Sequence, residues 1–239
     1  KKEDMIQLFG STGATDGWLV SLRSGQPIQY ILEETSFMGL NLEVNPDVLI
    51  PRSETEELVA SILDIEHSRE QARVLDIGTG SGCIALAIKH FRPEWEVIAL
   101  DRSEAALDVA RRNAIAMQLE IEFIPMDFLQ ASFQWSESFD LIISNPPYVD
   151  RQHAHLIPQS VLNFEPEIAL FPPGQDPLIF YRKIAEWGKE NMNPDAAIYL
   201  ELNEFYANEI RELMIHSGYG QVQVENDLQG APRLMKVVR

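Results

Sequence analysis

The sequence is poor in cysteine and in basic residues, and both deficits limit what the chain can be. Its 239 residues include one cysteine, Cys83, so an intramolecular disulfide framework is excluded and a reducing compartment is favoured. Lysine and arginine number 19 against 37 aspartates and glutamates, which gives a formal net charge of −18 at pH 7. Because an acidic surface repels phosphate backbones, nucleic acid is an unfavourable main partner. Arg111 and Arg112 are the best candidate for a local basic patch, with a solvated helix face as the simpler interpretation.

Long apolar runs and metal-ligand spacings are also missing. No run approaches the length of a membrane span, and the first residues lack the pattern of a secretory leader. Among the five histidines, His153 and His155 are the nearest pair, and no cysteine or second histidine pair accompanies them. We therefore expect a cytoplasmic protein with no metal centre and no membrane contact.

The most informative motif that is present is the turn Asn145-Pro146-Pro147-Tyr148, which follows an apolar, strand-like run at 139–144. The two prolines lack backbone N–H groups and have fixed φ angles, so the turn offers acceptors and almost no donors. The side-chain oxygen of Asn145 adds an acceptor, and the ring of Tyr148 adds a flat wall. Such a site suits a planar NH₂ group, either a carboxamide or the exocyclic amine of a base. An ordinary exit from a strand is the alternative, because Asn and Pro are common in turns.

A glycine-rich loop precedes this turn in the chain. An apolar strand ends at Asp76, the loop Gly78-Thr79-Gly80-Ser81-Gly82 follows, and an apolar helix begins at Cys83. The loop resembles a dinucleotide fingerprint, but Cys83 occupies the position of the third glycine. A second strand ends at Asp101, 19 residues after Gly82, the distance at which an acid meets ribose hydroxyls in nucleotide folds. A tight strand–helix turn and a helix-capping acid are the separate alternatives. Together with the turn at 145–148, these residues indicate binding of S-adenosyl-L-methionine.

Strands and helices alternate from residue 73 onward, which predicts an α/β fold with a doubly wound, Rossmann-like sheet. The last two strands have no helix between them, so we expect them to be antiparallel to each other. Asp76, Asp101, Asp127 and Asn145 fall at the ends of predicted strands, the edge where ligands bind in such sheets. The predicted strands are 73–77, 97–101, 121–125, 139–144, 196–202, 221–226 and 234–238, and the predicted helices are 51–63, 82–90, 103–117, 176–191 and 205–217.

The chain divides into three predicted regions. Residues 1–26 are expected to be a helical remnant or linker, with a helical fragment at 1–9 and a small, polar linker or mobile loop at 10–17. Residues 27–50 show short β-like pieces that predict a hairpin. Residues 51–239 are expected to form the catalytic domain.

Several further segments share a pattern with one enzyme family. They are Gly25-Gln26-Pro27-Ile28-Gln29-Tyr30-Ile31-Leu32, Val48-Leu49-Ile50-Pro51-Arg52-Ser53-Glu54-Thr55-Glu56, Phe164-Glu165-Pro166 and Asp227-Leu228-Gln229-Gly230-Ala231-Pro232-Arg233. With the glycine loop and the turn at 145–148, they make the chain resemble the protein-(glutamine-N5) methyltransferases that modify peptide-chain release factors. The Pro-Arg-x-Glu-Thr-Glu segment is the most specific part, because many other enzymes with Asn-Pro-Pro-Tyr lack it.

The chain also departs from that family's pattern. Ser53 stands where the family usually has proline, and Leu202-Asn203 replaces a more usual Ile-Gly. The family's N-terminal helical domain is more than twice as long as the material before Gly25. The resemblance therefore carries over to the chemistry better than to substrate docking.

The resemblance implies a class I methyltransferase domain with a seven-stranded sheet whose last strand is antiparallel. It implies methylation of the glutamine in the Gly-Gly-Gln loop of release factors, with Asn145 and Pro146 accepting hydrogen bonds from the substrate NH₂. Pro147 and Tyr148 would complete the wall of that subsite. Arg52 and Glu54 would position substrate or order the loop above the cofactor, with a helix-cap network as the alternative.

The cofactor contacts are implied in the same way. The loop at 78–82 would line the methionine end, and Asp101 would hold the ribose. Asp127 and Phe128 would meet the adenine, with simple core packing as the alternative for Phe128. Asn145 would border the cofactor as well as the substrate.

Other functions stay open. Glutamine methylation of a ribosomal protein uses the same chemistry on another partner. Methylation of adenine N6 or guanine N2 in nucleic acid would need base flipping and a basic track for phosphates, which the net charge opposes. A dehydrogenase that uses NAD would favour glycine at position 83 and leaves the turn at 145–148 unexplained. A scaffold without catalysis is disfavoured by the intact Asn145, Gly78, Gly80 and Asp101.

Overall fold

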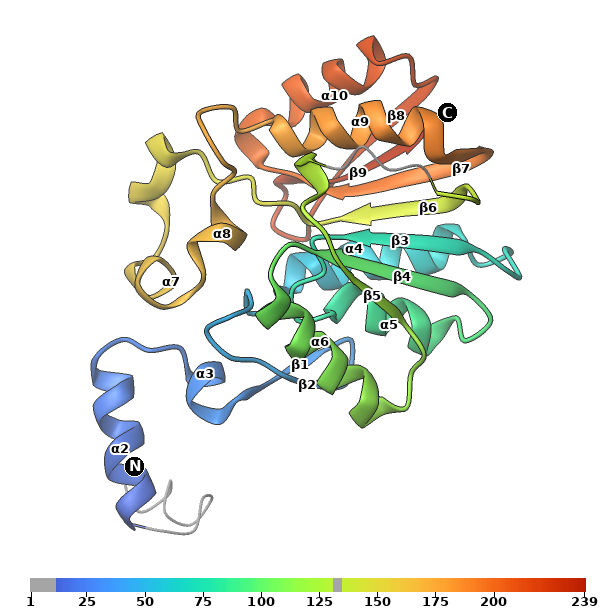
Figure 1. Cartoon of the computed structure of the whole chain (residues 1–239). Coiled ribbons are helices and arrows are strands. Elements are labelled where there is room, and N and C mark those ends of the chain that lie inside the picture. The colour runs from blue at the N-terminus through green and yellow to red at the C-terminus, as the bar shows by residue number, and fades with distance from the viewer. Residues whose placement is uncertain (1–11, 131–134) are drawn as a thin grey trace.

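The computed structural model describes residues 12–130 and 135–239 of the chain. Its centre is a sheet of seven strands: β3 (Arg73–Ile77), β4 (Glu96–Asp101), β5 (Glu122–Pro125), β6 (Phe139–Ser144), β7 (Met192–Glu201), β8 (Gln221–Asn226) and β9 (Pro232–Val238). Their order across the sheet is β5-β4-β3-β6-β7-β9-β8 (Figure 1). The neighbouring pairs from β5 to β7 are parallel, whereas β9 is antiparallel to both β7 and β8. The predicted seven-stranded sheet with an antiparallel last strand is confirmed.

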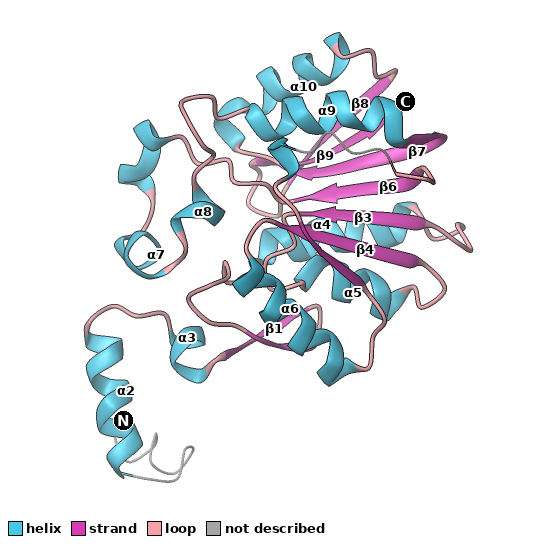
Figure 2. Ribbon diagram, in the orientation of Figure 1, coloured by secondary structure: helices cyan, strands magenta, loops and turns pink. Residues whose placement is uncertain are grey.

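Helices cover both faces of this sheet (Figure 2). One face carries α4 (Ser53–Ile65), α5 (Cys83–Phe91) and α6 (Glu104–Met117), and the other carries α9 (Ile179–Asn191) and α10 (Ala207–His216). Successive side chains of a strand point to opposite faces, so Leu75 packs toward α9 and Val74 packs toward α5. The five predicted helices are confirmed, with ends shifted by a turn or less. Within the described ranges, no helix is both long and apolar enough to cross a membrane.

Local chemistry sets several of these helix ends. The hydroxyl of Ser103 accepts the N–H of Ala106 at 3.2 Å, which caps the start of α6 as expected from the sequence. After α10, Gly218 has φ of +89°, a conformation that glycine adopts without strain. Both residues act as the sequence predicts.

A two-stranded antiparallel hairpin, β1 (Glu34–Phe37) and β2 (Leu40–Glu43), packs beside α6 and confirms the hairpin predicted within 27–50. Met38 and Gly39 at its tip have φ of +51° and +79°, as in a tight two-residue turn. Asn113 of α6 holds the hairpin: its Oδ1 accepts the N–H of Glu43 at 2.7 Å, and its Nδ2 donates to the carbonyl oxygen of Ser81 at 3.0 Å. The hairpin is thereby tied to the glycine loop.

Two short helices precede the hairpin, α2 (Thr12–Arg23) and α3 (Ile28–Leu32). The predicted linker at 10–17 is wrong from residue 12 onward, because Trp18, Leu19 and Leu22 continue the segment with the apolar spacing of a helix. The β-like pieces expected from residue 27 are likewise replaced by α3. The helical fragment expected at 1–9 lies outside the described residues.

The connection from β6 to α9 contains elements that the sequence did not predict. They are η2 (Arg151–Leu156), α7 (Gln159–Phe164) and α8 (Glu167–Leu170), and they lie beyond the carboxyl ends of the parallel strands (Figure 1). Two single turns, η1 (Phe128–Gln130) and η3 (Glu204–Tyr206), follow β5 and β7. Elements of this length are too short for hydrophobic periodicity to reveal.

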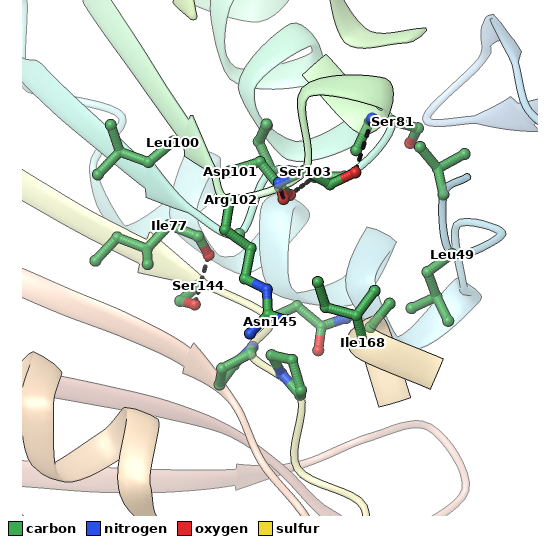
Figure 3. Close-up of a pocket in the computed structure, with 18 of the residues that line it drawn as sticks. Leu49, Ile77, Ser81, Leu100, Asp101, Arg102, Ser103, Ser144, Asn145 and Ile168 are labelled. Atoms are coloured by element: carbon green, nitrogen blue, oxygen red, sulfur yellow. Dashed lines mark hydrogen bonds between the residues drawn. The ribbon is translucent and has the colours of Figure 1, made fainter. Parts of the chain in front are cut away.

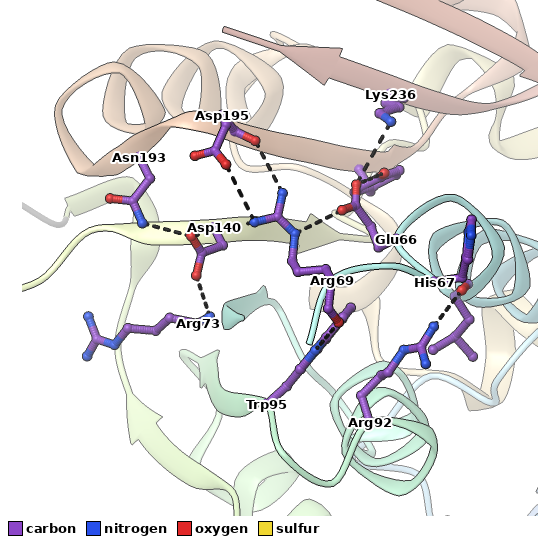
Figure 4. Close-up of polar contacts among 12 residues, drawn as sticks. Glu66, His67, Arg69, Arg73, Arg92, Trp95, Asp140, Asn193, Asp195 and Lys236 are labelled. Atoms are coloured by element: carbon purple, nitrogen blue, oxygen red, sulfur yellow. Dashed lines mark hydrogen bonds and ion pairs between the residues drawn. The ribbon is translucent and has the colours of Figure 1, made fainter. Parts of the chain in front are cut away.

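The opposite end of the sheet is held by a polar network (Figure 4). Arg69 donates to Glu66 at 2.9 Å, and Glu66 also accepts the hydroxyl of Tyr199 at 2.7 Å. Asp140 accepts the backbone N–H of Arg73 at 2.7 Å. The contact between Asp140 and Arg73 joins the amino ends of β3 and β6.

Candidate active site

A pocket opens at the carboxyl ends of β3, β4 and β6 (Figure 3). Its walls come from segments that are far apart in sequence, and most of the predicted site residues meet there. Those that line it are Arg52, Gly78, Thr79, Gly80, Ser81, Asp101, Asp127, Phe128, Asn145, Pro146 and Pro147. Glu54, Gly82 and Tyr148 were predicted as site residues but do not line the pocket.

The glycine loop forms one side of the pocket with its backbone. Gly78 and Gly80 have φ of +76° and +55°, and no atom lies within 4 Å of where a Cβ would stand on either residue. The N–H groups of Gly78 and Thr79 both donate to the carbonyl oxygen of Leu100 at 2.9 Å, which anchors the loop to the end of β4. The loop therefore holds an open cradle over the strand ends.

Gly82 differs from Gly78 and Gly80 because neighbouring side chains leave no room for a Cβ at this position. A Cβ at this position would stand 3.0 Å from Leu86 Cδ1 and 3.1 Å from Ala110 Cβ. The residue also has φ of +83° at the start of α5. Its absent side chain allows α5 and α6 to approach each other, so its contribution to the site is indirect.

Asp101 is fixed at the end of β4 by two backbone donors. Its Oδ2 accepts the N–H of Gly80 at 2.9 Å, and its Oδ1 accepts the N–H of Ser103 at 2.9 Å. Burial raises the pKa of the Asp101 carboxyl, and these hydrogen bonds oppose the rise. Each carboxylate oxygen keeps a second lone pair for a ligand hydroxyl.

The residues present fit S-adenosyl-L-methionine. The hydroxyl of Ser81 lines the pocket and is buried without a hydrogen-bond partner, which leaves a polar atom for a bound group. The open space at Gly78 and Gly80 admits a ligand close to the backbone. Across the described residues, no cluster of His, Cys, Asp or Glu could hold a metal ion.

Asp127 and Phe128 form the end of the pocket beyond β5. Asp127 accepts the N–H of Leu129 at 3.1 Å and the side-chain amide of Gln130 at 2.9 Å, which closes the turn η1. Phe128 is 4% exposed and meets Trp187 edge to face, with 5.6 Å between ring centroids. Phe128 therefore packs in the core and lines the pocket at the same time.

The turn after β6 presents its first three residues to the pocket. Ser144, just before it, donates to the carbonyl oxygen of Ile77 at 2.7 Å and so fixes the end of β6 against β3. Asn145 donates through Nδ2 to Thr55 Oγ1 at 3.1 Å. Its Oδ1 is the amide atom that remains for a ligand.

Tyr148 does not line the pocket, and its contacts anchor the turn. Its ring packs against the core, and its hydroxyl donates to Glu201 Oε1 at 2.8 Å. Asn203 donates to the backbone carbonyl oxygen of Tyr148 at 2.8 Å. The end of β7 thus supplies the carboxylate that accepts this hydroxyl, and the role of Tyr148 as a wall of the substrate subsite stays a prediction.

Glu201 is a buried carboxylate that the sequence analysis missed. It is 1% exposed and accepts the hydroxyl of Thr55 at 2.6 Å as well as that of Tyr148. Burial raises the pKa of the Glu201 carboxyl, while both hydrogen bonds and the charge of Arg233 oppose the rise. The sequence did contain a signal for Glu201. This residue lies near the end of the predicted strand 196–202, just as Asp76 and Asp101 lie near the ends of theirs.

Arg52 and Glu165 join two walls of the pocket. Arg52 forms an ion pair with Glu165, whose other oxygen accepts the N–H of Ile50 at 3.0 Å. Residues 47–49, 51 and 52 line the pocket, so the predicted boundary between regions 27–50 and 51–239 crosses one of its walls. Glu54 lies in the first turn of α4, where it accepts the hydroxyl of Ser53 at 3.0 Å, and no side-chain hydrogen bond caps the start of this helix.

The two arginines considered as a basic patch are neutralised. Arg111 pairs with Glu104 at 2.8 Å and with Asp108 at 3.0 Å. Arg112 pairs with Glu43 at 2.6 Å. These contacts support a solvated helix face and give no track for phosphates.

Comparisons with known proteins agree with this site. The family model described as Methyltransferase small domain matches residues 54–175. The chain is 40% identical over 222 residues to a release factor glutamine methyltransferase of Flavobacterium psychrophilum, covering 92% of this chain and 78% of the relative. It is 41% identical over 218 residues to the protein of the same name from Bacteroides thetaiotaomicron, covering 91% and 78%.

A solved structure extends the comparison to three dimensions. It is the release factor-specific protein-(glutamine-N5) methyltransferase of Alicyclobacillus acidocaldarius, which is 29% identical to this chain with a TM-score of 0.50. The match covers 83% of this chain and 99% of that one. The pocket described above thus belongs to a methyltransferase fold that binds S-adenosyl-L-methionine.

Proposed function

The chain belongs to the release factor glutamine methyltransferases, and we propose that it methylates the side-chain nitrogen of a glutamine in a peptide-chain release factor. The observation that carries the proposal is that Asn145 and Pro146 line the same pocket as the glycine loop and Asp101. An acceptor pair for a planar NH₂ group therefore stands beside a cradle for the methyl donor. A cytoplasmic location follows, because release factors act on translating ribosomes.

The chemistry depends on orientation more than on a base. An amide nitrogen is a poor nucleophile because its lone pair is delocalised into the carbonyl group. Oδ1 of Asn145 and the carbonyl oxygen of Pro146 accept hydrogen bonds from the substrate NH₂, which orients the nitrogen and offsets the positive charge that grows on it. Once methylated, the nitrogen is acidic and gives its proton to water.

The methyl donor is held by the residues that the sequence singled out. When bound, S-adenosyl-L-methionine supplies an electrophilic methyl group on its sulfonium sulfur. The loop at 78–81 receives its methionine end, and the carboxylate of Asp101 accepts from the ribose hydroxyls. Asp127 and Phe128 border the adenine.

The substrate glutamine belongs to an exposed loop whose neighbouring residues are glycines. A narrow pocket admits one side chain only where its neighbours have none. Arg52 and its partner Glu165 order the wall against which this loop would lie. The acidic surface favours a basic face on the release factor.

Methylation of a base is the competing function, since an exocyclic NH₂ uses the same acceptors. The net charge of −18 and the paired state of Arg111 and Arg112 disfavour it. Glutamine methylation of a ribosomal protein is a closer competitor with the same chemistry.

One experiment separates these functions. Transfer of a radiolabelled methyl group is measured to a purified release factor, to the same factor with its loop glutamine changed to alanine, to ribosomal proteins and to total RNA. The proposal predicts label in the first substrate alone. Label in RNA or in ribosomal protein, with an unlabelled release factor, would refute it.

A further inference from the structure

A chain of hydrogen bonds runs from the end of β7 to the turn after β6. Glu201 Oε2 accepts the hydroxyl of Thr55 at 2.6 Å, and Thr55 Oγ1 accepts Nδ2 of Asn145 at 3.1 Å. Thr55 and Glu201 are 2% and 1% exposed, so water does not compete for these groups. We propose that Thr55 and Glu201 are positioning residues that set the rotation of the Asn145 amide so that Oδ1 faces the substrate nitrogen.

The argument rests on the single proton of the threonine hydroxyl. A carboxylate accepts only, so the proton between Thr55 and Glu201 belongs to Thr55. With that proton committed, Thr55 Oγ1 can only accept from Asn145. An amide rotated by half a turn would bring Oδ1 against Oγ1 with no hydrogen between them, which is repulsive. The negative charge of Glu201 therefore directs Oδ1 of Asn145 toward the pocket, although Glu201 itself does not touch the substrate.

Carboxylate chemistry is needed at position 201 for the same reason. A glutamine there could donate its NH₂ to Thr55, which would free the threonine proton to donate to Oδ1 of Asn145. The acceptor for the substrate would then be occupied within the protein. Ionised glutamate excludes this arrangement because it has no proton to give.

The same carboxylate fixes the far end of the turn. Its Oε1 accepts the hydroxyl of Tyr148 at 2.8 Å, so Glu201 holds both Asn145, through Thr55, and Tyr148. The end of β7 is braced in turn, because Tyr181 donates to the carbonyl oxygen of Glu201 at 2.9 Å and Arg233 donates to that of Leu202 at 3.1 Å. Glu201, at the end of β7, thus fixes both the first and the last residue of the turn at 145–148.

This inference rests on the proposed function, in which Asn145 accepts from the substrate. The variants to compare are Thr55→Val, which keeps the shape and removes the hydroxyl, and Thr55→Ser, which keeps the hydroxyl. We expect Thr55→Val to lower kcat by about 10²-fold, the scale of a misplaced reacting group, while the affinity for S-adenosyl-L-methionine changes little. The Tm also falls, because the buried carboxylate of Glu201 loses a donor. Thr55→Ser restores most of the rate. Glu201→Gln lowers kcat in the same direction.

A double-mutant cycle shows whether Thr55 acts through Asn145. In the Asn145→Ala background, Thr55→Val should have no further effect on kcat, because the amide that it orients is gone. Losses that multiply would overturn the proposal, as would a Thr55→Ser variant as slow as Thr55→Val. Methylation of the release factor by the wild-type protein is measured first, and no methylation there refutes the proposed function. The mutant cycle is then run on whichever NH₂ substrate the protein does methylate. On that substrate, multiplying losses or a slow Thr55→Ser variant would still refute the positioning role.

Discussion

The guanidinium of Arg52 pairs with the carboxylate of Glu165 across 113 residues of sequence, and this contact joins the start of α4 to the end of α7. The side chain of Glu165 is 1% exposed, whereas that of Arg52 is 34% exposed. Glu165 therefore needs the ion pair more than Arg52 does, because without it the carboxylate of Glu165 would be a buried, unpaired charge. Both residues lie in segments that carry the family resemblance.

Removal of the Arg52 side chain should therefore destabilise the protein. We expect Arg52→Ala to lower the free energy of unfolding by about 1 to 3 kcal/mol, because Glu165 loses its counter-charge while Ile50 remains its donor. Arg182→Ala is the control, since the Arg182–Asp176 pair is exposed on both sides and should contribute less than about 1 kcal/mol. Urea unfolding measures both variants. Equal stability of the two would mean that the Arg52–Glu165 pair does not stabilise the pocket wall.

Asp101 provides a test of cofactor binding. Asp101→Asn keeps an oxygen for one backbone donor but loses the charge, so binding of S-adenosyl-L-methionine should weaken by about 2 kcal/mol. Asp140→Asn removes a carboxylate from the opposite end of the sheet and should leave the affinity unchanged (Figure 4). Titration calorimetry compares the two. An unchanged affinity in folded Asp101→Asn would remove Asp101 from the site.

Asn145 separates binding from chemistry. Asn145→Ala deletes the acceptor for the substrate NH₂, so kcat should fall by about 10² or more while cofactor affinity changes little. The matched control is Asn163→Ala, which removes an exposed asparagine whose side chain accepts from Gln159. Single-turnover rates and calorimetry give the two quantities. If rate and affinity fell equally, Asn145 would be a cofactor ligand or a structural residue.

The strand ends were predictable from the sequence, but their contacts were not. Asp76 and Asp101 follow apolar runs, and that local pattern is enough to place them at the rim of the sheet. Glu201 obeys the same rule, yet its partners Thr55 and Tyr148 lie 146 and 53 residues away, and no local pattern encodes those distances.

Gly82 and Tyr148 show the complementary limit. Both belong to motifs that the family resemblance assigns to ligands, and neither lines the pocket. Gly82 is required by the approach of Ala110 from α6, and Tyr148 is drawn to the carboxylate of Glu201. A motif predicts the residue type at a position, whereas the packing of the folded chain decides what its side chain contacts.

Asp76 makes the stability of the protein depend on pH. Burial raises the pKa of its carboxyl from the ordinary value of 3.8 to about 7, although Thr79 donates to it at 2.6 Å. The folded state therefore binds a proton more tightly than the unfolded state does, and stability is lost as pH rises from about 3.8 to about 7. Above that range the whole cost of the buried charge is present.

The comparison with Asp76→Asn isolates this effect, because asparagine keeps an acceptor for Thr79 and cannot ionise. The free energy of unfolding of the variant, minus that of the wild type, should rise with pH across this range and then level off. Urea unfolding without ligand at several pH values gives the difference. Two curves that stay parallel would show that Asp76 titrates normally.

The central claim is that this pocket methylates a glutamine amide of a release factor. The most direct measurement is tandem mass spectrometry of a release factor after incubation with the protein and S-adenosyl-L-methionine. The account predicts one added methyl group on the side-chain nitrogen of the glycine-flanked loop glutamine, formed by the wild type and strongly reduced with Asn145→Ala. An unmodified loop glutamine, with methylated adenine or guanine in added RNA, would contradict it.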